Sequence, residues 1–279
     1  MAKRPQILVT NDDGIDSLGL YELARAVSEH GDVMVVAPDQ EFSGASSAIG
    51  SIADMKPQAH RREIPDLPGD NNVWAVSGPP ALCVLFVRMG AFDFEPDLVV
   101  SGINPGANIG RSVYHSGTIG ACLTGRNGGV SGIAVSQALQ HWNTNGQSWN
   151  EAIAKLDWST AATLGATAAG AMLASPPAEP QVLNINVPDK PLAEINRWSW
   201  TTVSEKPPSE SSAARLESIA GHTNSFDIKV DWGSKWDGEN GSDVHAISEG
   251  ELSLTWIAKL TAQPDDGSGV GTAVEQVLR

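Results

Sequence analysis

Two adjacent carboxylates, Asp12 and Asp13, follow a short run of strand-forming residues at positions 6–10. Asn11 precedes this pair and Gly14 follows it, so the four residues also fit an ordinary turn. Neighbouring negative charges repel each other, and a bound divalent cation removes that repulsion. The pair therefore predicts half of a cation site, with a simple strand-ending turn as the alternative.

Further oxygen-bearing side chains follow two later apolar runs of the chain. Ser43 comes shortly after the run at 32–38, and Asn104 and Asn108 come after the run at 98–100. Two carboxylates, a hydroxyl and a carboxamide form a hard, all-oxygen set that suits Mg²⁺, Mn²⁺ or Ca²⁺. If the loops converge, the sequence predicts a divalent-cation site between them.

The segment HSGTIGACL at 115–123 places small and hydroxyl-bearing residues at the expected start of a helix. Ser116 is suited to cap that helix, and Gly117 and Thr118 would form its first turn. The free N–H groups and the dipole of a helix start attract anions. Beside a cation, this segment predicts a phosphate-binding site, while a plain helix cap is the alternative. The role of His115 stays open between an acid, a substrate contact and a surface residue.

Strand-like and helix-like runs alternate along the chain up to residue 189, which indicates a parallel sheet wrapped by helices. Runs such as VMVV and LVV do not alternate with polar residues, as expected when both faces of a sheet are covered. Ligands of such sheets bind beyond the carboxyl ends of the strands, where the loops described above should meet. We expect strands at 6–10, 32–38, 73–76, 98–100, 132–136 and 181–189, and helices at 17–27, 80–89, 116–128 and 149–173.

The chain changes character beyond residue 189. We expect a catalytic core at 1–189 and a smaller, β-rich extension at 190–279 that includes a β-hairpin and a terminal helix. The alternating segment at 251–262 predicts one of its strands. We expect this extension to make contacts between subunits.

Charge and cysteine content narrow the range of functions. The chain carries 33 acidic against 18 basic residues and a net charge of -15, which argues against a nucleic-acid polymer as partner. Cys83 and Cys122 lie in apolar surroundings and are predicted to be buried free thiols. No apolar run is long enough for a membrane helix, so we expect no membrane partner and a cytoplasmic location.

Taken together, these motifs resemble the SurE family, the stationary-phase survival nucleotidases. The matching stretches occur in the family's order over most of residues 6–189: ILVTNDDG, VVAPDQEFSGAS, PDLVVSGINPGANIG, VYHSGTIGA, GIAVS and LNINVPD. The resemblance implies an α/β fold with a Rossmann-like core. It also implies a metal-dependent phosphatase that hydrolyses nucleoside 5′- or 3′-monophosphates, with other phosphomonoesters as possible substrates.

The same resemblance implies roles for single residues. One divalent cation per subunit, Mg²⁺, Mn²⁺ or Ca²⁺, would be bound by Asp12, Asp13, Ser43 and Asn104. The residues near the phosphate would be Asn11, Asn108, Ser116, Gly117 and Thr118, and the catalytic residues Asp12, Asp13 and Asn108. The resemblance further implies a homodimer or homotetramer in which the C-terminal segments exchange between subunits.

Several positions depart from the family pattern while the proposed ligand types are kept. They are Gln40, Phe42, Pro79, Leu82 and Thr124. These departures bear on substrate preference and on the level of activity. They leave an alternative function open, a nucleotide- or metal-binding protein with weak or no catalysis. A dinucleotide-dependent oxidoreductase fits the fold class, but the glycine-rich loop after the 98–100 run lacks the GxGxxG spacing.

Overall fold

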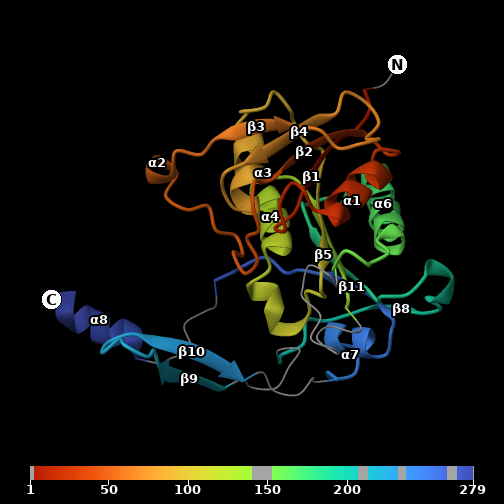
Figure 1. Cartoon of the computed structure of the whole chain (residues 1–279). Coiled ribbons are helices and arrows are strands. Elements are labelled where there is room, and N and C mark those ends of the chain that lie inside the picture. The colour runs from red at the N-terminus through yellow and green to blue at the C-terminus, as the bar shows by residue number, and fades with distance from the viewer. Residues whose placement is uncertain (1–2, 140–152, 207–212, 232–236, 263–268, 279) are drawn as a thin grey trace.

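The computed structural model describes residues 3–139, 153–206, 213–231, 237–262 and 269–278 (Figure 1). Its centre is a nine-stranded sheet with the order β3-β4-β2-β1-β5-β6-β7-β11-β8. The strands of this sheet are β1 (Gln6–Thr10), β2 (Asp32–Pro38), β3 (Ala59–Arg62), β4 (Asn72–Val76), β5 (Leu98–Pro105), β6 (Gly132–Gln137), β7 (Val182–Val187), β8 (Trp198–Trp200) and β11 (Leu252–Trp256). The run from β4 to β7 is parallel throughout, whereas β3 and β11 join it antiparallel. The predicted α/β class with a mostly parallel sheet is confirmed.

Helices cover both faces of this sheet. The helices are α1 (Leu18–Val27), α2 (Ile52–Met55), α3 (Pro80–Arg88), α4 (Gly117–Asn127), α6 (Ser159–Ala174), α7 (Asp243–Ser248) and α8 (Val270–Leu278). Two 3-10 turns, Gly110–Tyr114 and Leu192–Glu194, complete the helical elements that are described. The central strands β1, β2, β5 and β6 are mostly buried because helices cover both of their faces.

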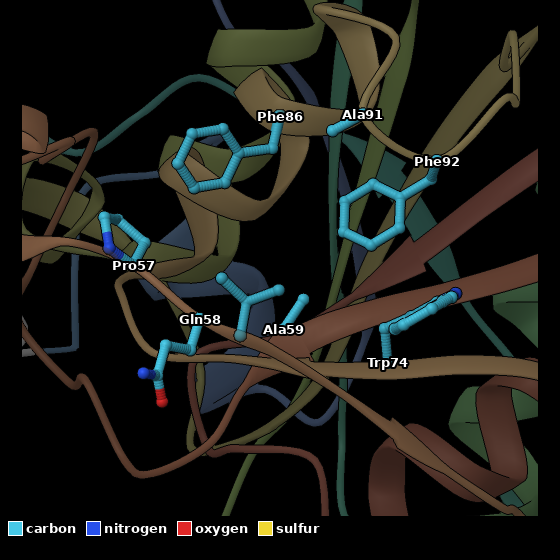
Figure 2. A pocket seen from close by; sticks show the side chains of 8 residues that line it. Pro57, Gln58, Ala59, Trp74, Phe86, Ala91 and Phe92 are labelled. Carbon is cyan, nitrogen blue, oxygen red and sulfur yellow. The ribbon is translucent and has the colours of Figure 1, made fainter.

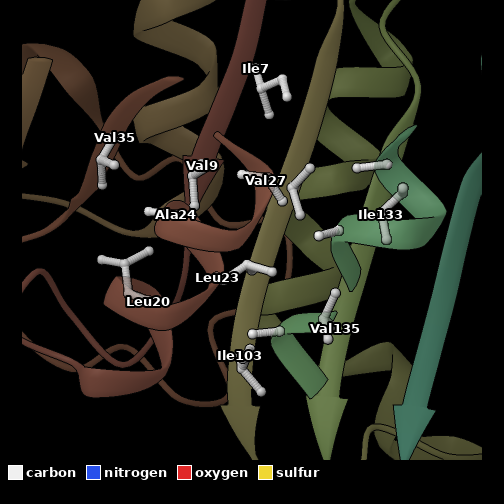
Figure 3. Packing of buried hydrophobic residues seen from close by; sticks show 14 of the residues in the cluster. Ile7, Val9, Leu20, Leu23, Ala24, Val27, Val35, Ile103, Ile133 and Val135 are labelled. Atoms are coloured by element: carbon white, nitrogen blue, oxygen red, sulfur yellow. The ribbon is translucent and has the colours of Figure 1, made fainter. Parts of the chain in front are cut away.

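One face of the sheet packs against α1 and α6 (Figure 3). Leu20, Leu23 and Val27 repeat at helical spacing and place the apolar side of α1 against strand residues such as Val9 and Ile103. In α6 the buried side is mostly small, with Ala161, Ala162, Ala166 and Ala169. Small side chains allow α1 and α6 to lie close together over the sheet.

The opposite face packs against α3 and α4. Cys83 and Val84 of α3 meet Ile119 and Cys122 of α4 in this second cluster. Both cysteines are free and buried, as predicted, and burial raises the pKa of each thiol far above its ordinary range. Such thiols are packing groups with low reactivity.

The strand order reverses at β1. The chain proceeds from β1 through α1 to β2 on one side, and later returns to place β5 on the other side of β1. In open α/β sheets, ligands bind where the strand order reverses in this way, beyond the carboxyl ends of the strands. The predicted site residues that follow β1 and β5 therefore lie at the expected crevice.

The long helix predicted from residue 149 to residue 173 was wrong at its start. Residues 149–152 lie outside the described residues, and the described chain between Lys155 and Trp158 is not helical. Helix α6 begins at Ser159, where the backbone N–H donates to Asp157 Oδ1 at 2.9 Å. An aspartate before the first helical residue satisfies an N–H group that has no partner inside the helix, and so favours a start there.

One part of the segment from residue 190 onward joins the main sheet, and the other part is exposed. Strands β8 and β11 extend the main sheet, and α7 packs beside β11. The antiparallel pair β9 (Ala213–Ser218) and β10 (Phe226–Asp231) and the helix α8 lie apart from the main sheet (Figure 1), with every described residue in them exposed. The predicted hairpin and terminal helix are therefore present, while the domain boundary at residue 189 stays a prediction. Among the described residues, no helix has the length and apolarity needed to cross a membrane.

Candidate active site

The loop after β1 carries the first three predicted site residues. Asn11 and Asp12 are buried and Asp13 is half-buried, as the chain turns sharply away from the sheet edge. The side-chain amide of Asn11 donates to the carbonyl of Gly14 at 3.1 Å and closes this turn. Gly14 adopts a φ of 99°, which favours glycine. The NDDG turn thus presents its two carboxylates beyond the carboxyl end of β1.

The first turn of α4 lies directly against Asp12. Thr118 Oγ1 donates to Asp12 Oδ1 at 2.7 Å, and both residues are buried. A Cβ atom on Gly117 would come within 2.8 Å of Asp12 Oδ2, so only glycine allows this approach. Ser116 caps the helix as predicted, because its hydroxyl accepts a hydrogen bond from the N–H of Ile119 at 3.1 Å. The structure therefore brings Asp12 together with the predicted phosphate-binding segment.

The loop after β2 closes over the same place. The N–H of Phe42 donates to the Asp12 carbonyl at 2.7 Å, which places Ser43 in the loop beside the carboxylates. The N–H of Ser46 donates to the His115 carbonyl at 3.1 Å, and a Cβ atom on Gly120 would come within 2.0 Å of the Ser46 carbonyl oxygen. The Ser43 loop is therefore held between the β1 loop and α4, and ligation by Ser43 stays a prediction.

Burial raises the pKa values of both carboxyl groups, and repulsion by neighbouring carboxylates raises that of Asp13 further. Burial raises the pKa of Asp12, and hydrogen bonds from Thr118 and Gly117 partly offset the effect. The pKa of Asp13 rises to about 8, first through burial and then through the negative charges of Asp12 and Glu41. Two carboxylates in this place are unfavourable unless a positive charge accompanies them.

The donor set fits a hard divalent cation. Asp13 Oδ2 and Asn11 Oδ1 are buried oxygens to which no described protein group donates a hydrogen bond. Unsatisfied buried acceptors are costly in proteins and are typical of a site that a cation or water completes. Within the part of the chain that is described, no group of three His, Cys, Asp or Glu side chains could hold a metal ion. A cation here must therefore also use hydroxyl or carboxamide oxygens, as the sequence predicted.

Asn104 lies near the end of β5, next to β1. The register between β5 and β6 shifts between Ser101 and Asn104, an irregularity of the kind that redirects side chains beside active sites. The Asn104 amide nitrogen donates to the Gly106 carbonyl at 2.6 Å. Its oxygen is thereby left as the acceptor that a cation would use, and ligation by Asn104 stays a prediction.

Asn108 is held by three strand residues that our sequence interpretation did not include in the site. Its backbone N–H donates to Asn186 Oδ1 at 2.8 Å, and its carbonyl accepts from the amides of Asn184 at 2.9 Å and Asn186 at 3.2 Å. Its side-chain amide donates to Ser136 Oγ at 2.9 Å. The signal was present in the sequence, since two asparagines alternate within the apolar strand VLNINV.

An apolar pocket lies elsewhere on the molecule (Figure 2). It has a volume of about 300 Å³ and is lined by Trp74, Phe86 and Phe92 beside the edge strand β3. The Trp74 and Phe92 rings meet edge to face at 5.3 Å, with the guanidinium of Arg61 4.2 Å from the Trp74 ring. None of the predicted site residues lines this pocket, so it is separate from the candidate active site.

Comparison with known proteins decides the family. The model of the family described as survival protein SurE matches residues 7–210. The chain belongs to the SurE family. It is 34% identical over 257 residues to the 5′-nucleotidase SurE of Xanthomonas axonopodis pv. citri (strain 306), an alignment that covers 90% of this chain and 89% of that protein.

The solved structure of the SurE protein from Aquifex aeolicus has the same fold. It superposes with a TM-score of 0.74 at 25% sequence identity, covering 99% of this chain and 100% of that chain. The mostly parallel sheet and the loops at its carboxyl edge are therefore the SurE architecture.

Three of the positions that depart from the expected family pattern leave the proposed ligands in place. At Phe42 the contact with Asp12 is made by the backbone, so the change of side chain does not remove it. Leu82 is fully buried in α3, and the hydroxyl of Thr124 donates to the Gly120 carbonyl within α4 at 2.9 Å. These two side chains serve packing and helix structure, and neither displaces a proposed ligand.

Proposed function

We propose that this SurE protein is a metal-dependent phosphomonoesterase that hydrolyses nucleoside 5′- or 3′-monophosphates. The observation that carries the proposal is the direct contact between the first turn of α4 and Asp12, beside the half-buried carboxylate of Asp13. A helix start that can bind phosphate is thereby adjacent to a donor set that fits a cation. The 5′-nucleotidase named among its relatives supports the same chemistry.

Asp12, Asp13, Ser43 and Asn104 would bind one divalent cation per subunit, either Mg²⁺, Mn²⁺ or Ca²⁺. When bound, such a cation polarises the phosphoryl oxygens and lowers the pKa of a coordinated water. The support in this chain is the pair of raised carboxyl pKa values and the buried oxygens that no described group satisfies. Binding a cation would lower both carboxyl pKa values and would give the buried oxygens a partner.

The remaining phosphate oxygens would be held by Asn108, Asn11 and the first turn of α4. The start of α4 favours an anion nearby through its dipole, although the N–H groups of Gly117 and Thr118 themselves donate to the Asp12 carboxylate. Fixed donors aimed at a charge that grows in the transition state stabilise that state more than the ground state. The rigid hold on Asn108 by β6 and β7 supports such a role for its side chain.

The attack on phosphorus can follow two routes. The surroundings of the two aspartates decide which of them is better placed to take part. In the first route a water attacks, its proton moves to an aspartate and the nucleoside oxygen leaves. In the second route an aspartate oxygen attacks phosphorus, the bond to the nucleoside oxygen breaks, and that oxygen takes up a proton as the nucleoside leaves; water then cleaves the acyl phosphate to release phosphate and the free aspartate. Asp12 Oδ1 is engaged by Thr118, whereas Asp13 Oδ2 has no described partner, so we assign the proton acceptor to Asp13.

The experiment is a phosphate-release assay on the full chain with nucleoside 5′- and 3′-monophosphates. We expect turnover with Mg²⁺ or Mn²⁺, loss of turnover in EDTA, and at least about a hundredfold loss of kcat in Asp12→Asn. Asp16→Asn, which alters an exposed carboxylate in the same loop, is the matched control. Wild-type turnover in the presence of EDTA, or full activity in Asp12→Asn, would contradict the proposal.

The alternative function, binding of a nucleotide or metal without catalysis, makes a different prediction. Calorimetry would then detect saturable nucleotide binding while no phosphate is released with any of the three metals. The departures at Gln40 and Phe42 are the reason to test this alternative, because both residues precede the proposed ligand Ser43.

We also propose that the chain assembles as a homodimer or homotetramer through its C-terminal segment. The hairpin β9–β10 exposes Leu216, Phe226 and Ile228 to solvent, and α8 has no buried residue. An isolated two-stranded hairpin is marginally stable, and exposed apolar surface of this kind marks an interface. A second copy of this chain would cover both elements.

A further inference from the structure

The loop between β5 and α4 connects the two halves of the proposed phosphate site. It carries Asn108 near its beginning and leads through the 3-10 turn Gly110–Tyr114 to Ser116, the cap of α4. Strands β6 and β7 hold Asn108 through Ser136, Asn184 and Asn186. The part of the loop after Asn108 needs a separate anchor, because it lies beyond the reach of these hydrogen bonds.

That anchor is Asp243, the first residue of α7, which comes from far along the chain. Its side chain is fully buried, and Oδ2 accepts a hydrogen bond from the N–H of Gly110 at 3.0 Å. Oδ1 accepts from the N–H of Ser204 at 3.0 Å and from that of Val244 at 2.8 Å. The three donors are backbone groups from three separate segments, so one carboxylate joins the site loop to the C-terminal segment.

A second set of contacts keeps the same two segments close together. The Lys206 carbonyl accepts from the N–H of Arg111 at 3.3 Å, and Arg111 Nε donates to the Glu205 carbonyl at 2.5 Å. Gly110 has a φ of 54°, and a Cβ atom there would come within 2.4 Å of the Lys206 carbonyl oxygen. The loop and the 204–206 segment are therefore packed too tightly for a side chain at position 110.

We propose that Asp243 is a positioning residue for the phosphate site, acting through the Gly110 backbone on Asn108. Gly110 is two residues from Asn108, so the hydrogen bond to Gly110 sets where the chain runs as it leaves Asn108. A small displacement of a group that contacts the transferred phosphate lowers the rate steeply. This role rests on the proposed phosphatase function and adds a residue from outside the loops that carry the cation ligands.

The chemical requirement at position 243 is specific to a carboxylate. A carboxylate accepts hydrogen bonds at both oxygens, whereas an amide offers one acceptor oxygen and turns an N–H₂ group toward the other donors. In Asp243→Asn the single acceptor oxygen satisfies more donors when it faces Ser204 and Val244, so the N–H₂ group would face the N–H of Gly110. The loop would lose its anchor while the volume of the side chain stays the same.

The test compares Asp243→Asn with Glu251→Gln, the same chemical change at a carboxylate that contacts Arg197 and Ser199 in the C-terminal segment and makes no hydrogen bond to the site loop. We expect kcat for a nucleoside monophosphate to fall about tenfold to a hundredfold in Asp243→Asn, with less than about a threefold change in KM. Glu251→Gln should keep the wild-type kcat. Thermal unfolding confirms that both variants are folded at the assay temperature.

A double-mutant cycle separates positioning from general loss of structure. If Asp243 acts through Asn108, its substitution should cost almost nothing further in an Asn108→Ala background. Equal losses of kcat with and without Asn108 would overturn the proposal. Gly110→Ala, which forces the loop away from Lys206, should reproduce the loss of kcat and serves as the second variant if Asp243→Asn does not fold.

Amide hydrogen exchange of residues 109–112 provides a readout that needs no turnover. Exchange there should be faster in Asp243→Asn than in Glu251→Gln, and equal rates would contradict the anchor. A wild-type chain that releases no phosphate would overturn the proposed function and with it the effect of Asp243 on turnover. The exchange rates would still decide whether Asp243 holds the loop.

Discussion

At the scale of single residues, the two adjacent aspartates have different surroundings. Asp12 accepts a hydrogen bond from Thr118 and has the first turn of α4 against it, whereas Asp13 lies next to Asp12 and near Glu41 with a buried oxygen that no described group satisfies. The contacts of Asp12 fix the orientation of its carboxylate, whereas Asp13 has an oxygen available for a cation or a proton. The chemistry of the pair therefore depends on what occupies the space beside Asp13.

The raised pKa of Asp13 predicts how the metal-free chain responds to pH. The pKa rises from an ordinary value of 3.8 in the unfolded chain to about 8 in the folded chain, so the folded state holds the proton more tightly. The free energy of unfolding should therefore fall as pH increases from about 4 to about 8, because only the unfolded state releases the proton easily. Urea unfolding in EDTA across this range measures the effect.

Asp13→Asn supplies the control for this pH dependence. The variant should unfold with at least about 2 kcal/mol more free energy than wild type at pH 8 in EDTA, and its stability should depend less on pH. Asp16→Asn removes an exposed carboxylate nearby and should leave the wild-type profile unchanged. A wild-type profile in Asp13→Asn would show that this carboxyl group is not the one that titrates.

At the scale of secondary-structure elements, the position of the Ser43 loop depends on close packing against α4. Gly120 allows the loop backbone to rest on the helix, and Gly117 allows the Asp12 side chain to do the same one turn earlier. The β5 irregularity and the asparagines of β7 act similarly on Asn104 and Asn108. Each loop is placed by an element that belongs to a different part of the chain.

Gly120→Ala tests the contact between α4 and the loop. The new methyl group would lie 2.0 Å from the Ser46 carbonyl oxygen and must displace the loop that carries Ser43. We expect the affinity for Mn²⁺ to fall about tenfold and stability to decrease by about 1–3 kcal/mol.

A titration of the metal-free chain by calorimetry measures that affinity. Gly271→Ala, in α8 where nothing lies within 4 Å, is the matched control. Unchanged Mn²⁺ affinity in Gly120→Ala would show that the loop position does not matter for the cation.

At the scale of the whole molecule, the chain consists of a well-packed sheet with its helices and an exposed hairpin and helix. Val270, Val274 and Val277 form a stripe at helical spacing on α8, and Val277 is 86% exposed. A stripe of this kind is stable in water only when another surface covers it. The exposed stripe therefore supports the proposed association through this segment.

Charges placed on that stripe should weaken the assembly. We expect Val274→Asp combined with Val277→Asp to shift the mass measured by light scattering toward a monomer, because association would bury two uncompensated charges. Gln276→Asp adds a charge on another side of the same helix and should keep the wild-type mass. An unchanged mass in the double variant would place the subunit contact elsewhere.

Local patterns in the sequence were sufficient for most strands of the sheet, though not for β3 and β8, for several helices and for the start of the site. Apolar runs bounded by turn residues located strands such as β1 and β2, and the Ser116 cap located the start of α4, because these features depend on neighbours within a few residues. The pair Asp12 and Asp13 and the helix start at 116–118 were also recognisable as oxygen donors and an anion site. Their meeting at one edge followed from the parallel sheet alone.

Only the tertiary structure showed what holds these groups in place. Asn186 and Asp243 contact the 108–110 loop across 78 and 133 residues of chain, and no local pattern encodes such a contact. The start of α6 at Ser159, whose N–H donates to the Asp157 carboxylate, overrides a longer helical pattern in the sequence. The pKa of Asp13 is likewise set by burial and by nearby charges, which are properties of the folded surroundings and not of the sequence around the residue.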